Sequence, residues 1–306
     1  MTLSEIRANR FGSITWTEQK LTILEEYLKQ YTTALKNQDF HLTYLDAFAG
    51  TGYVNPNLAE EQRTRSGWGD ALDDPAREVL IGSTRRAIAV TDKPFDTFIF
   101  IEQNASHAAE LRRVRTEFSS RDIRIEQSDA NAFLQMWCDG QNQSLGVPWN
   151  RSGLRQRAVV FLDPFATQVR WRTVAAVAST QSIDLWILFP LSALTRIMPR
   201  DREPEESWAD RLDEVYGGDE WRTLYQTRIR RTLFGDEAET VRAGQEAIVQ
   251  VYLEKLSTVF PHVSASPKWF HNSRHSPLFA FMFAAANPGR GGRIALNIAN
   301  HLLDRW

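Results

Sequence analysis

The chain has 306 residues, of which 42% are hydrophobic and 24% charged, and its formal net charge is -2. These values are typical of a globular protein and exclude a disordered or fibrous one. The near-zero net charge gives the whole chain no electrostatic attraction to nucleic acid or anionic lipid. The single cysteine, Cys138, excludes an intramolecular disulfide and any metal site built from cysteines alone.

The longest apolar stretches, 183–194 and 277–286, are too short to cross a bilayer. The first residues, MTLSEIRANRFGS, contain no apolar segment of the kind found in signal peptides. We therefore expect a soluble, cytoplasmic protein that does not associate with membranes.

Apolar periodicity predicts the regular elements. A helix is expected over 17–37, with Thr17 as its N-cap, because apolar side chains recur at spacings of three and four (Leu21, Leu24, Leu28, Tyr31 and Leu35). Strands are expected at seven short apolar segments: 41–48, 97–102, 123–126, 158–163, 184–189, 277–286 and 293–298. Helices are expected between them, at 74–89, 105–119, 130–139 and 171–179.

Four of the predicted strands are nearly continuous in Val, Ile, Leu and Phe, which is typical of strands buried on both faces of a parallel sheet. Their alternation with helices predicts an α/β fold, Rossmann-like and doubly wound, with a mostly parallel seven-stranded sheet. Residues 195–270 are charged and predicted to be a helical insertion after strand five. Residues 1–194 and 271–306 would then form the Rossmann-like domain. The polar segment 53–73 is predicted to be a long loop, and loops of that length are usually functional or disordered.

The first strand ends in the sequence Leu-Asp-Ala-Phe-Ala-Gly-Thr-Gly, residues 45–52. Glycine permits a positive φ and lets a backbone approach a ligand closely. In open α/β sheets, ligands bind beyond the carboxyl ends of the strands, beside the first strand. Gly50 and Gly52 are therefore candidates for contact with a nucleoside-like ligand, although a plain tight turn would explain them as well.

Acidic residues follow the next two strands. Glu102 ends the second strand, where a carboxylate can accept hydrogen bonds from both ribose hydroxyls, although an ordinary solvated acid is the alternative. Asp129, followed by Ala130, comes after the third strand. Asp129 could accept from an adenine amine, cap the next helix, or do both.

The fourth strand ends in Asp163-Pro164-Phe165. Asp163 and a backbone carbonyl could orient an amine, because proline fixes the turn and has no N–H. Phe165 could stack on a planar substrate. Asp-Pro is also a common turn, so its position beside the other two motifs is what makes it informative.

These motifs, in this order, resemble those of class I S-adenosylmethionine-dependent methyltransferases, and Asp-Pro-Phe resembles the acceptor motif of amino-methyltransferases with one proline instead of two. The chain is also similar to the three-Cys-motif partner (TcmP) family in YLDAFAGTG, FLDPFATQVRW, IDLWILFPLSALTR and PLFAFMFAAANPG. The resemblance implies S-adenosyl-L-methionine as cofactor and a separate three-Cys-motif protein as partner. It further implies that Asp46, Phe48, Gly50 and Gly52 contact the methionine end of the cofactor, Glu102 the ribose, and Asp129 with Ala130 the adenine, while Asp163, Pro164 and Phe165 face the acceptor.

The leading interpretation is a methyltransferase acting on nitrogen, with a nucleobase amine in a nucleic acid as the acceptor. A small molecule or a modified peptide is an alternative acceptor, and a cofactor-binding module that regulates its partner without catalysis is another alternative. The arginines at 222, 228, 230 and 231 are candidates for phosphate contacts, or a solvated helix face offset by nearby acids. The histidines have no metal-ligand spacing, so we expect no metal site, and the oligomeric state stays open.

Overall fold

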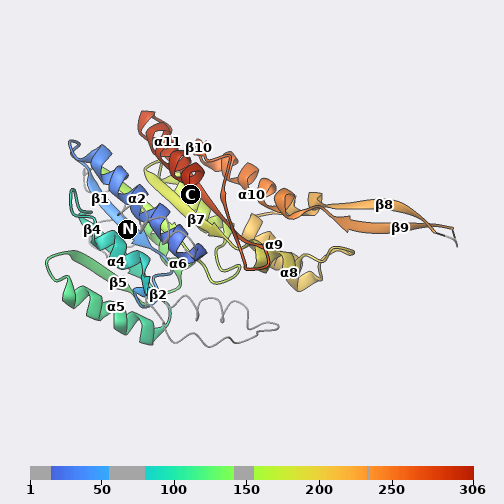
Figure 1. Ribbon diagram of the computed structural model, residues 1–306, viewed down its shortest axis with the longest axis horizontal. Helices are drawn as coiled ribbons and strands as arrows, with labels where there is room; N and C mark the ends of the chain where they lie inside the picture. The colour runs from blue at the N-terminus through green and yellow to red at the C-terminus, as the bar shows by residue number, and fades with distance from the viewer. Residues whose placement is uncertain (1–14, 55–79, 141–154, 233–234) are drawn as a thin grey trace, which may run out of the picture.

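The computed structural model describes residues 15–54, 80–140, 155–232 and 235–306 (Figure 1). A sheet of eight strands crosses the molecule in the order β10-β12-β7-β6-β1-β4-β5, and β11 also pairs with β12. Five strands are parallel: β1 (His41–Asp46), β4 (Thr97–Ile101), β5 (Asp122–Glu126), β6 (Gln156–Leu162) and β7 (Ile183–Phe189). β12 (Pro277–Ala285) is antiparallel to β7, and β10 (His262–Val263) and β11 (Lys268–His271) are antiparallel to β12. The Rossmann-like, doubly wound fold predicted from the sequence is confirmed.

Helices cover both faces of the sheet (Figure 1). One face packs against α2 (Trp16–Leu35), α4 (Ser83–Ile88), α5 (Ala105–Glu117) and α11 (Arg290–Arg305). The other packs against α6 (Ala130–Cys138), α7 (Trp171–Ser179), α8 (Leu191–Ile197), α9 (Glu206–Tyr216) and α10 (Gln245–Val259). The inner parallel strands β1, β4, β6 and β7 are mostly apolar because successive side chains point to opposite faces and both faces are covered, whereas the edge strand β5 is mostly charged.

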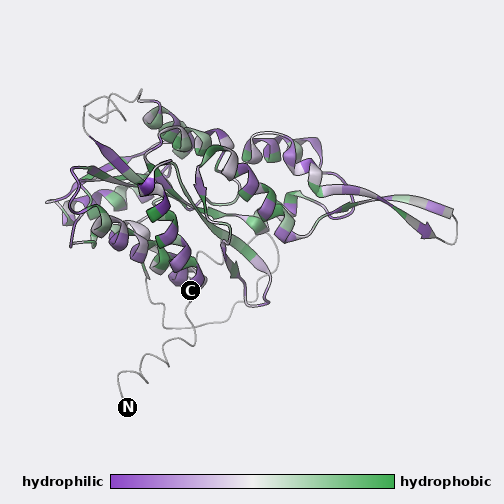
Figure 2. Cartoon of the chain, turned by 90° about the horizontal axis from the view of Figure 1, so that it is seen from above, coloured by the Kyte–Doolittle hydropathy of each residue, from purple (hydrophilic) through white to green (hydrophobic). Residues whose placement is uncertain are grey.

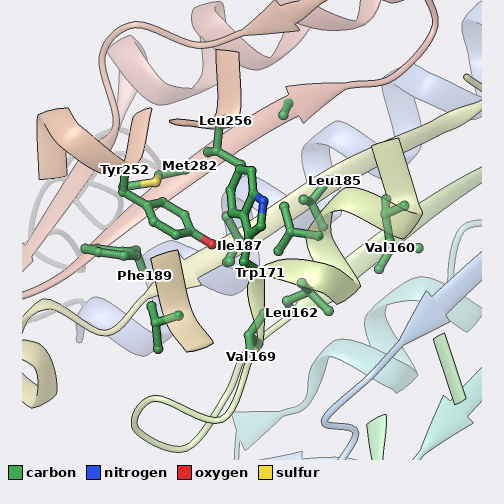
Figure 3. Close-up of a cluster of buried hydrophobic side chains, with 14 of the residues drawn as sticks. Val160, Leu162, Val169, Trp171, Leu185, Ile187, Phe189, Tyr252, Leu256 and Met282 are labelled. Carbon is green, nitrogen blue, oxygen red and sulfur yellow. The ribbon is translucent and has the colours of Figure 1, made fainter. Parts of the chain in front are cut away.

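The larger hydrophobic core extends beyond the parallel strands. Val160, Leu162, Leu185 and Ile187 on β6 and β7 meet Tyr252 and Leu256 of α10, as Figure 3 shows for this cluster. The face of α10 that meets the sheet is therefore part of the main core, even though α10 belongs to the segment predicted as an insertion.

Three local predictions are wrong. The segment 293–298 is not a strand but part of α11, whose buried Ala295, Ala299 and Leu302 follow a helical period. The N-cap of α2 is Thr15, which accepts a hydrogen bond from Glu18 N at 3.3 Å, and Thr17 lies inside the helix. The predicted helix 74–89 is wrong in its described part, residues 80–89. There, Leu80–Ile81 form the strand β3, which pairs with β2 (Tyr53–Val54), and the helix α4 covers Ser83–Ile88.

The segment 195–270 is only partly helical. It contains a long hairpin of β8 (Tyr225–Thr232) and β9 (Gly235–Arg242), preceded by a 3-10 helix at Glu220–Leu224. Figures 1 and 2 show the hairpin extending away from the body of the protein. β10 and β11 also lie in this range and belong to the main sheet. The division into domains stays a prediction, and most of the predicted 53–73 loop lies outside the described residues.

Candidate functional site

A cleft of about 630 Å³ lies at the carboxyl ends of the parallel strands. It sits where the chain order reverses, because β1 has β4 on one side and β6 on the other. Seven of the predicted site residues line this cleft: Phe48, Gly50, Glu102, Asp129, Ala130, Asp163 and Phe165. Parallel strands bring them together, since their carboxyl ends all meet at one edge.

The two glycines of the turn after β1 have different environments. Gly50 has φ +61° and lines the cleft, and a Cβ added there would meet no protein atom within 4 Å. A side chain at Gly50 would therefore occupy the space of a ligand. Gly52 has φ +81°, and its Cβ would come within 3.1 Å of Thr84 Oγ1 and 3.3 Å of Val114 Cγ2. Gly52 does not line the cleft, and its role is in the packing of the turn.

Glu102 connects the turn after β1 to the start of α5. One carboxylate oxygen accepts a hydrogen bond from Gly50 N at 3.0 Å, and the other accepts from Asn104 N at 2.7 Å. His107 Nδ1 lies 3.8 Å from the same carboxylate. Each carboxylate oxygen can accept more than one hydrogen bond, so Glu102 can hold this turn and still receive the two hydroxyls of a ribose.

Asp129 is the N-cap of α6, because its side chain accepts a hydrogen bond from Ala132 N at 2.9 Å. The next polar residue, Asn131, was not singled out in the sequence. It is buried and donates to Gln168 O at 2.9 Å, and its Oδ1 accepts from Arg170 N at 3.0 Å. Asn131 therefore fixes the loop that follows β6 against the start of α6. An asparagine directly inside a capped helix start is a weak signal, because it is usually solvated.

Asp46 lies behind the cleft and does not line it. Its buried carboxylate accepts hydrogen bonds from Phe48 N at 3.2 Å and from the Ser83 hydroxyl. Burial raises the pKa of Asp46 to about 7, with the nearby Asp163 acting in the same direction and Ser83 against it. Pro164 is also outside the cleft, against Ile187 and Phe189. The position of these two residues and of Gly52 favours a supporting role over the direct ligand contact expected from the resemblance.

Asp163 forms an ion pair with Lys20 of α2. Lys20 is buried, and its ammonium lies 5.4 Å from the ring centroid of Trp16 and 5.8 Å from that of Phe161. The sequence analysis missed Lys20. The signal was a lysine inside the apolar stripe of a helix, between Thr17 and Leu24, where a cation is buried only if it has a partner.

The loop of residues 163–170 contributes Asp163, Phe165, Gln168 and Arg170 to one wall of the cleft. Phe165 is 50% exposed although it is a large apolar residue, and its backbone N–H donates to Gln168 Oε1 at 2.8 Å. Ala166 has φ +57°, a conformation that costs energy for a residue with a side chain. Two arginines complete this wall, Arg170 from the loop itself and Arg211 from α9, and neither was among the predicted site residues.

The basic cluster predicted at 222–231 does not face the cleft. Arg222 stacks on Trp221 at 4.4 Å, and Arg228 and Arg231 lie on the hairpin opposite Glu239 and Asp236. Acidic residues therefore lie opposite these two arginines, but on a strand hairpin and not on the helix face that the alternative interpretation expected. Within the described residues, no group of three or more His, Cys, Asp or Glu side chains gathers in a way that could hold a metal ion.

Several solved structures are similar to this chain at low sequence identity. One is LPL1258 from Legionella pneumophila, with 9% identity, coverage of 93% of this chain and 91% of that chain, and a TM-score of 0.47. A second is an S-adenosylmethionine-dependent methyltransferase from Clostridium acetobutylicum, with 10% identity, coverage of 85% and 91%, and a TM-score of 0.33. A third is the magnesium protoporphyrin IX methyltransferase of Synechocystis with bound S-adenosylmethionine, with 11% identity, coverage of 76% and 86%, and a TM-score of 0.30.

No family profile and no curated protein matches the sequence. Among the described residues, no helix combines the length and the apolar character needed to span a bilayer.

Proposed function

We propose that the protein is an S-adenosylmethionine-dependent methyltransferase that methylates a nitrogen, the exocyclic amine of a nucleobase. One observation carries this proposal: the glycine turn, Glu102 and Asp129 line the same cleft as Asp163 and Phe165. The first group suits a nucleoside-like methyl donor, and the second suits a planar amine.

The residues of the cleft fit the donor. Open space at Gly50 leaves room for the methionine part, and Glu102 is placed to accept from the ribose hydroxyls. Asp129 lies at the adenine end, where its helix cap leaves a carboxylate oxygen available. When bound, the cofactor supplies a methyl group on a positively charged sulfur, and the acidic side chains of the cleft favour that charge.

Asp163 is placed to accept a hydrogen bond from the acceptor amine, so that the nitrogen lone pair points at the methyl group. A bound donor would supply the methyl group and keep the electron pair of its carbon–sulfur bond, and the methylated amine would release a proton to solvent. Such a displacement is accelerated mainly by orientation. Lys20 supports this role because its positive charge favours the ionised, hydrogen-bond-accepting form of Asp163.

The resemblance to the three-Cys-motif partner family adds a partner to the proposal. The single cysteine of this chain is buried in α6, and burial raises the pKa of its thiol far above the usual range. Any chemistry of a three-cysteine motif would therefore belong to a second protein. We propose that this protein presents or activates the substrate.

Two measurements test the proposal. Calorimetry with S-adenosylmethionine and S-adenosylhomocysteine should give one binding site per chain. The protein should then transfer labelled methyl groups to a fraction of a panel of RNA, DNA and cell extract, with and without the protein encoded beside it. Label recovered in the small-molecule or peptide fraction would identify that class of molecule as the acceptor in place of a nucleobase. Cofactor binding without transfer to any fraction would favour a regulatory module, and no cofactor binding would refute the proposal.

A further inference from the structure

Two arginines stand beside the acceptor turn, and the structure holds each of them in place. Arg170 is the N-cap of α7, and its backbone N–H donates to the buried Asn131. Arg211 lies on α9, and its Nε donates to Thr167 Oγ1 at 3.0 Å. Arg170 therefore starts from a backbone that is fixed at the end of the loop carrying Asp163 and Phe165, and the Arg211 guanidinium is hydrogen-bonded to that same loop, although α9 lies beyond β7 in the chain.

One carboxylate links the two side chains. Glu214 Oε2 lies 2.5 Å from Arg211 Nη1 and 3.7 Å from Arg170 Nε. The three groups together carry a charge of +1, and each arginine side chain is about one-third exposed. Within the part of the chain that the structure describes, the terminal nitrogens of Arg170 and Nη2 of Arg211 donate no hydrogen bond, and both arginines line the cleft.

Charge is divided along the cleft. Glu102 and Asp129 belong to the proposed donor end, whereas Arg170 is part of the loop that carries the half-exposed Phe165 and Arg211 is hydrogen-bonded to it. Guanidinium groups match the oxygens of a phosphate with paired hydrogen bonds, and aromatic rings stack on bases. A nucleotide satisfies both requirements at once, because its flat base and its phosphate are joined by one sugar.

We propose that Arg170 and Arg211 form a phosphate subsite for the acceptor, so that the substrate is a nucleotide whose base lies on Phe165 and whose phosphate is bound by these arginines. This inference rests on the proposed function, since it names the substrate class of the same cleft. Glu214 holds the two guanidinium groups in position and at the same time competes with the phosphate for them.

Because Glu214 competes with the phosphate for the arginines, replacing Glu214 should change the affinity for nucleic acid in the opposite direction from replacing Arg170 or Arg211. The probes are a fluorescent, mixed-sequence single-stranded RNA and its DNA equivalent, read by anisotropy with S-adenosylhomocysteine present. Arg170→Gln and Arg211→Gln should each weaken binding about tenfold. Each should also reduce the slope of log affinity against log salt by about 0.7. Glu214→Gln should tighten binding, a gain that misfolding does not produce.

The chain offers a matched control in α5. Arg113 and Glu110 form the same kind of helical ion pair three residues apart, outside the cleft. Arg113→Gln and Glu110→Gln should leave binding and the salt slope unchanged. Unlabelled AMP and CMP, added as competitors, distinguish the source of the phosphate: competition at similar concentrations indicates a free nucleotide, and its absence indicates a nucleic acid. Either result supports the subsite.

Two results would overturn it. One is binding that Arg170→Gln and Arg211→Gln reduce no more than Arg113→Gln does. The other is a wild-type protein that binds neither the oligonucleotides nor the mononucleotides. Calorimetry with S-adenosylmethionine on the same preparations tests the proposed function separately. Donor binding without phosphate binding would refute the phosphate subsite and leave the proposed function standing.

Discussion

Lys20 of α2 and Asp163 in the turn after β6 form an ion pair across 143 residues of sequence. The lysine side chain is 3% exposed and the aspartate side chain 19% exposed. A buried ammonium that loses a carboxylate partner costs more free energy than the intact pair contributes. The pair therefore ties α2 to the turn after β6 that lines the cleft.

This relationship predicts non-additive stability effects. Asp163→Ala should lower the free energy of unfolding by about 3 kcal/mol, because Lys20 is left buried without that carboxylate. Adding Lys20→Met should recover part of the loss, as measured by urea denaturation. The exposed pair of Lys29 and Glu25 is the control, with a coupling under about 1 kcal/mol. Additive effects at Lys20 and Asp163 would mean that the pair is not formed in solution.

Loss of the Asp163 carboxylate should reduce the rate of methyl transfer much more than it reduces the affinity for the methyl donor. In the Lys20→Met/Asp163→Ala double variant, which avoids the buried charge, the affinity for S-adenosylmethionine should stay within a few-fold of wild type. Methyl transfer to the identified acceptor should be lost, because the missing contact orients the acceptor. Full transfer by this variant would exclude Asp163 from orienting an amine and would favour an oxygen or carbon acceptor.

The two glycines of the turn after β1 should respond differently to substitution. Gly50→Val projects a side chain into the open cleft and should abolish calorimetric binding of S-adenosylmethionine. Gly52→Ala crowds Thr84 and Val114 behind the turn, so it should lower the melting temperature and leave the affinity of the folded protein nearly unchanged. If folded Gly50→Val binds the cofactor normally, the turn is not part of the site.

The effect of replacing Glu102 on donor affinity can be compared with the effect of replacing Glu126, an acid at the end of the neighbouring strand β5. Glu102→Ala should weaken S-adenosylmethionine binding by about 1–3 kcal/mol, since it removes charged hydrogen bonds to the ribose and the tether on Gly50 N. Glu126→Ala at the end of β5 should have no effect, because Glu126 does not line the cleft. Equal affinities for the two variants would identify Glu102 as a structural residue only.

Asp184 should make stability depend on pH. Its carboxylate is buried on β7 and accepts a hydrogen bond from Tyr27 Oη at 2.7 Å, and burial raises its pKa from 3.8 to about 7. Between these two values the folded chain binds the proton more tightly than the unfolded chain does. The contribution is therefore complete below about pH 4 and is lost as the pH rises through about 7, with a slope of at most about 1.4 kcal/mol per pH unit.

Asp184→Asn keeps an acceptor for Tyr27 and should flatten this part of the stability profile, measured by urea denaturation at a series of pH values. Asp46, whose pKa is also raised to about 7 by burial, should account for part of the slope that remains. The exposed Asp210 is the control, and Asp210→Asn should leave the slope unchanged. A wild-type profile that rises between pH 4 and 7 would contradict the prediction.

The sequence by itself determined the parallel sheet and the edge where the site lies. Strands covered on both faces are apolar at most positions, so β1, β4, β6 and β7 could be recognised without their neighbours. Because the carboxyl ends of parallel strands meet, Gly50, Glu102 and Asp163 were expected to come together, and all three line the cleft.

The tertiary structure alone decided which of these residues face the cleft and which lie behind it. Asp46 and Gly50 belong to one motif, yet one is buried and the other borders open space, because the turn between them rotates their side-chain directions. Lys20 reaches Asp163, and Arg211 reaches the same loop, through helices packed on opposite faces of the sheet. Periodicity along a chain reports which face of an element is buried, but it carries no information about which distant element covers that face.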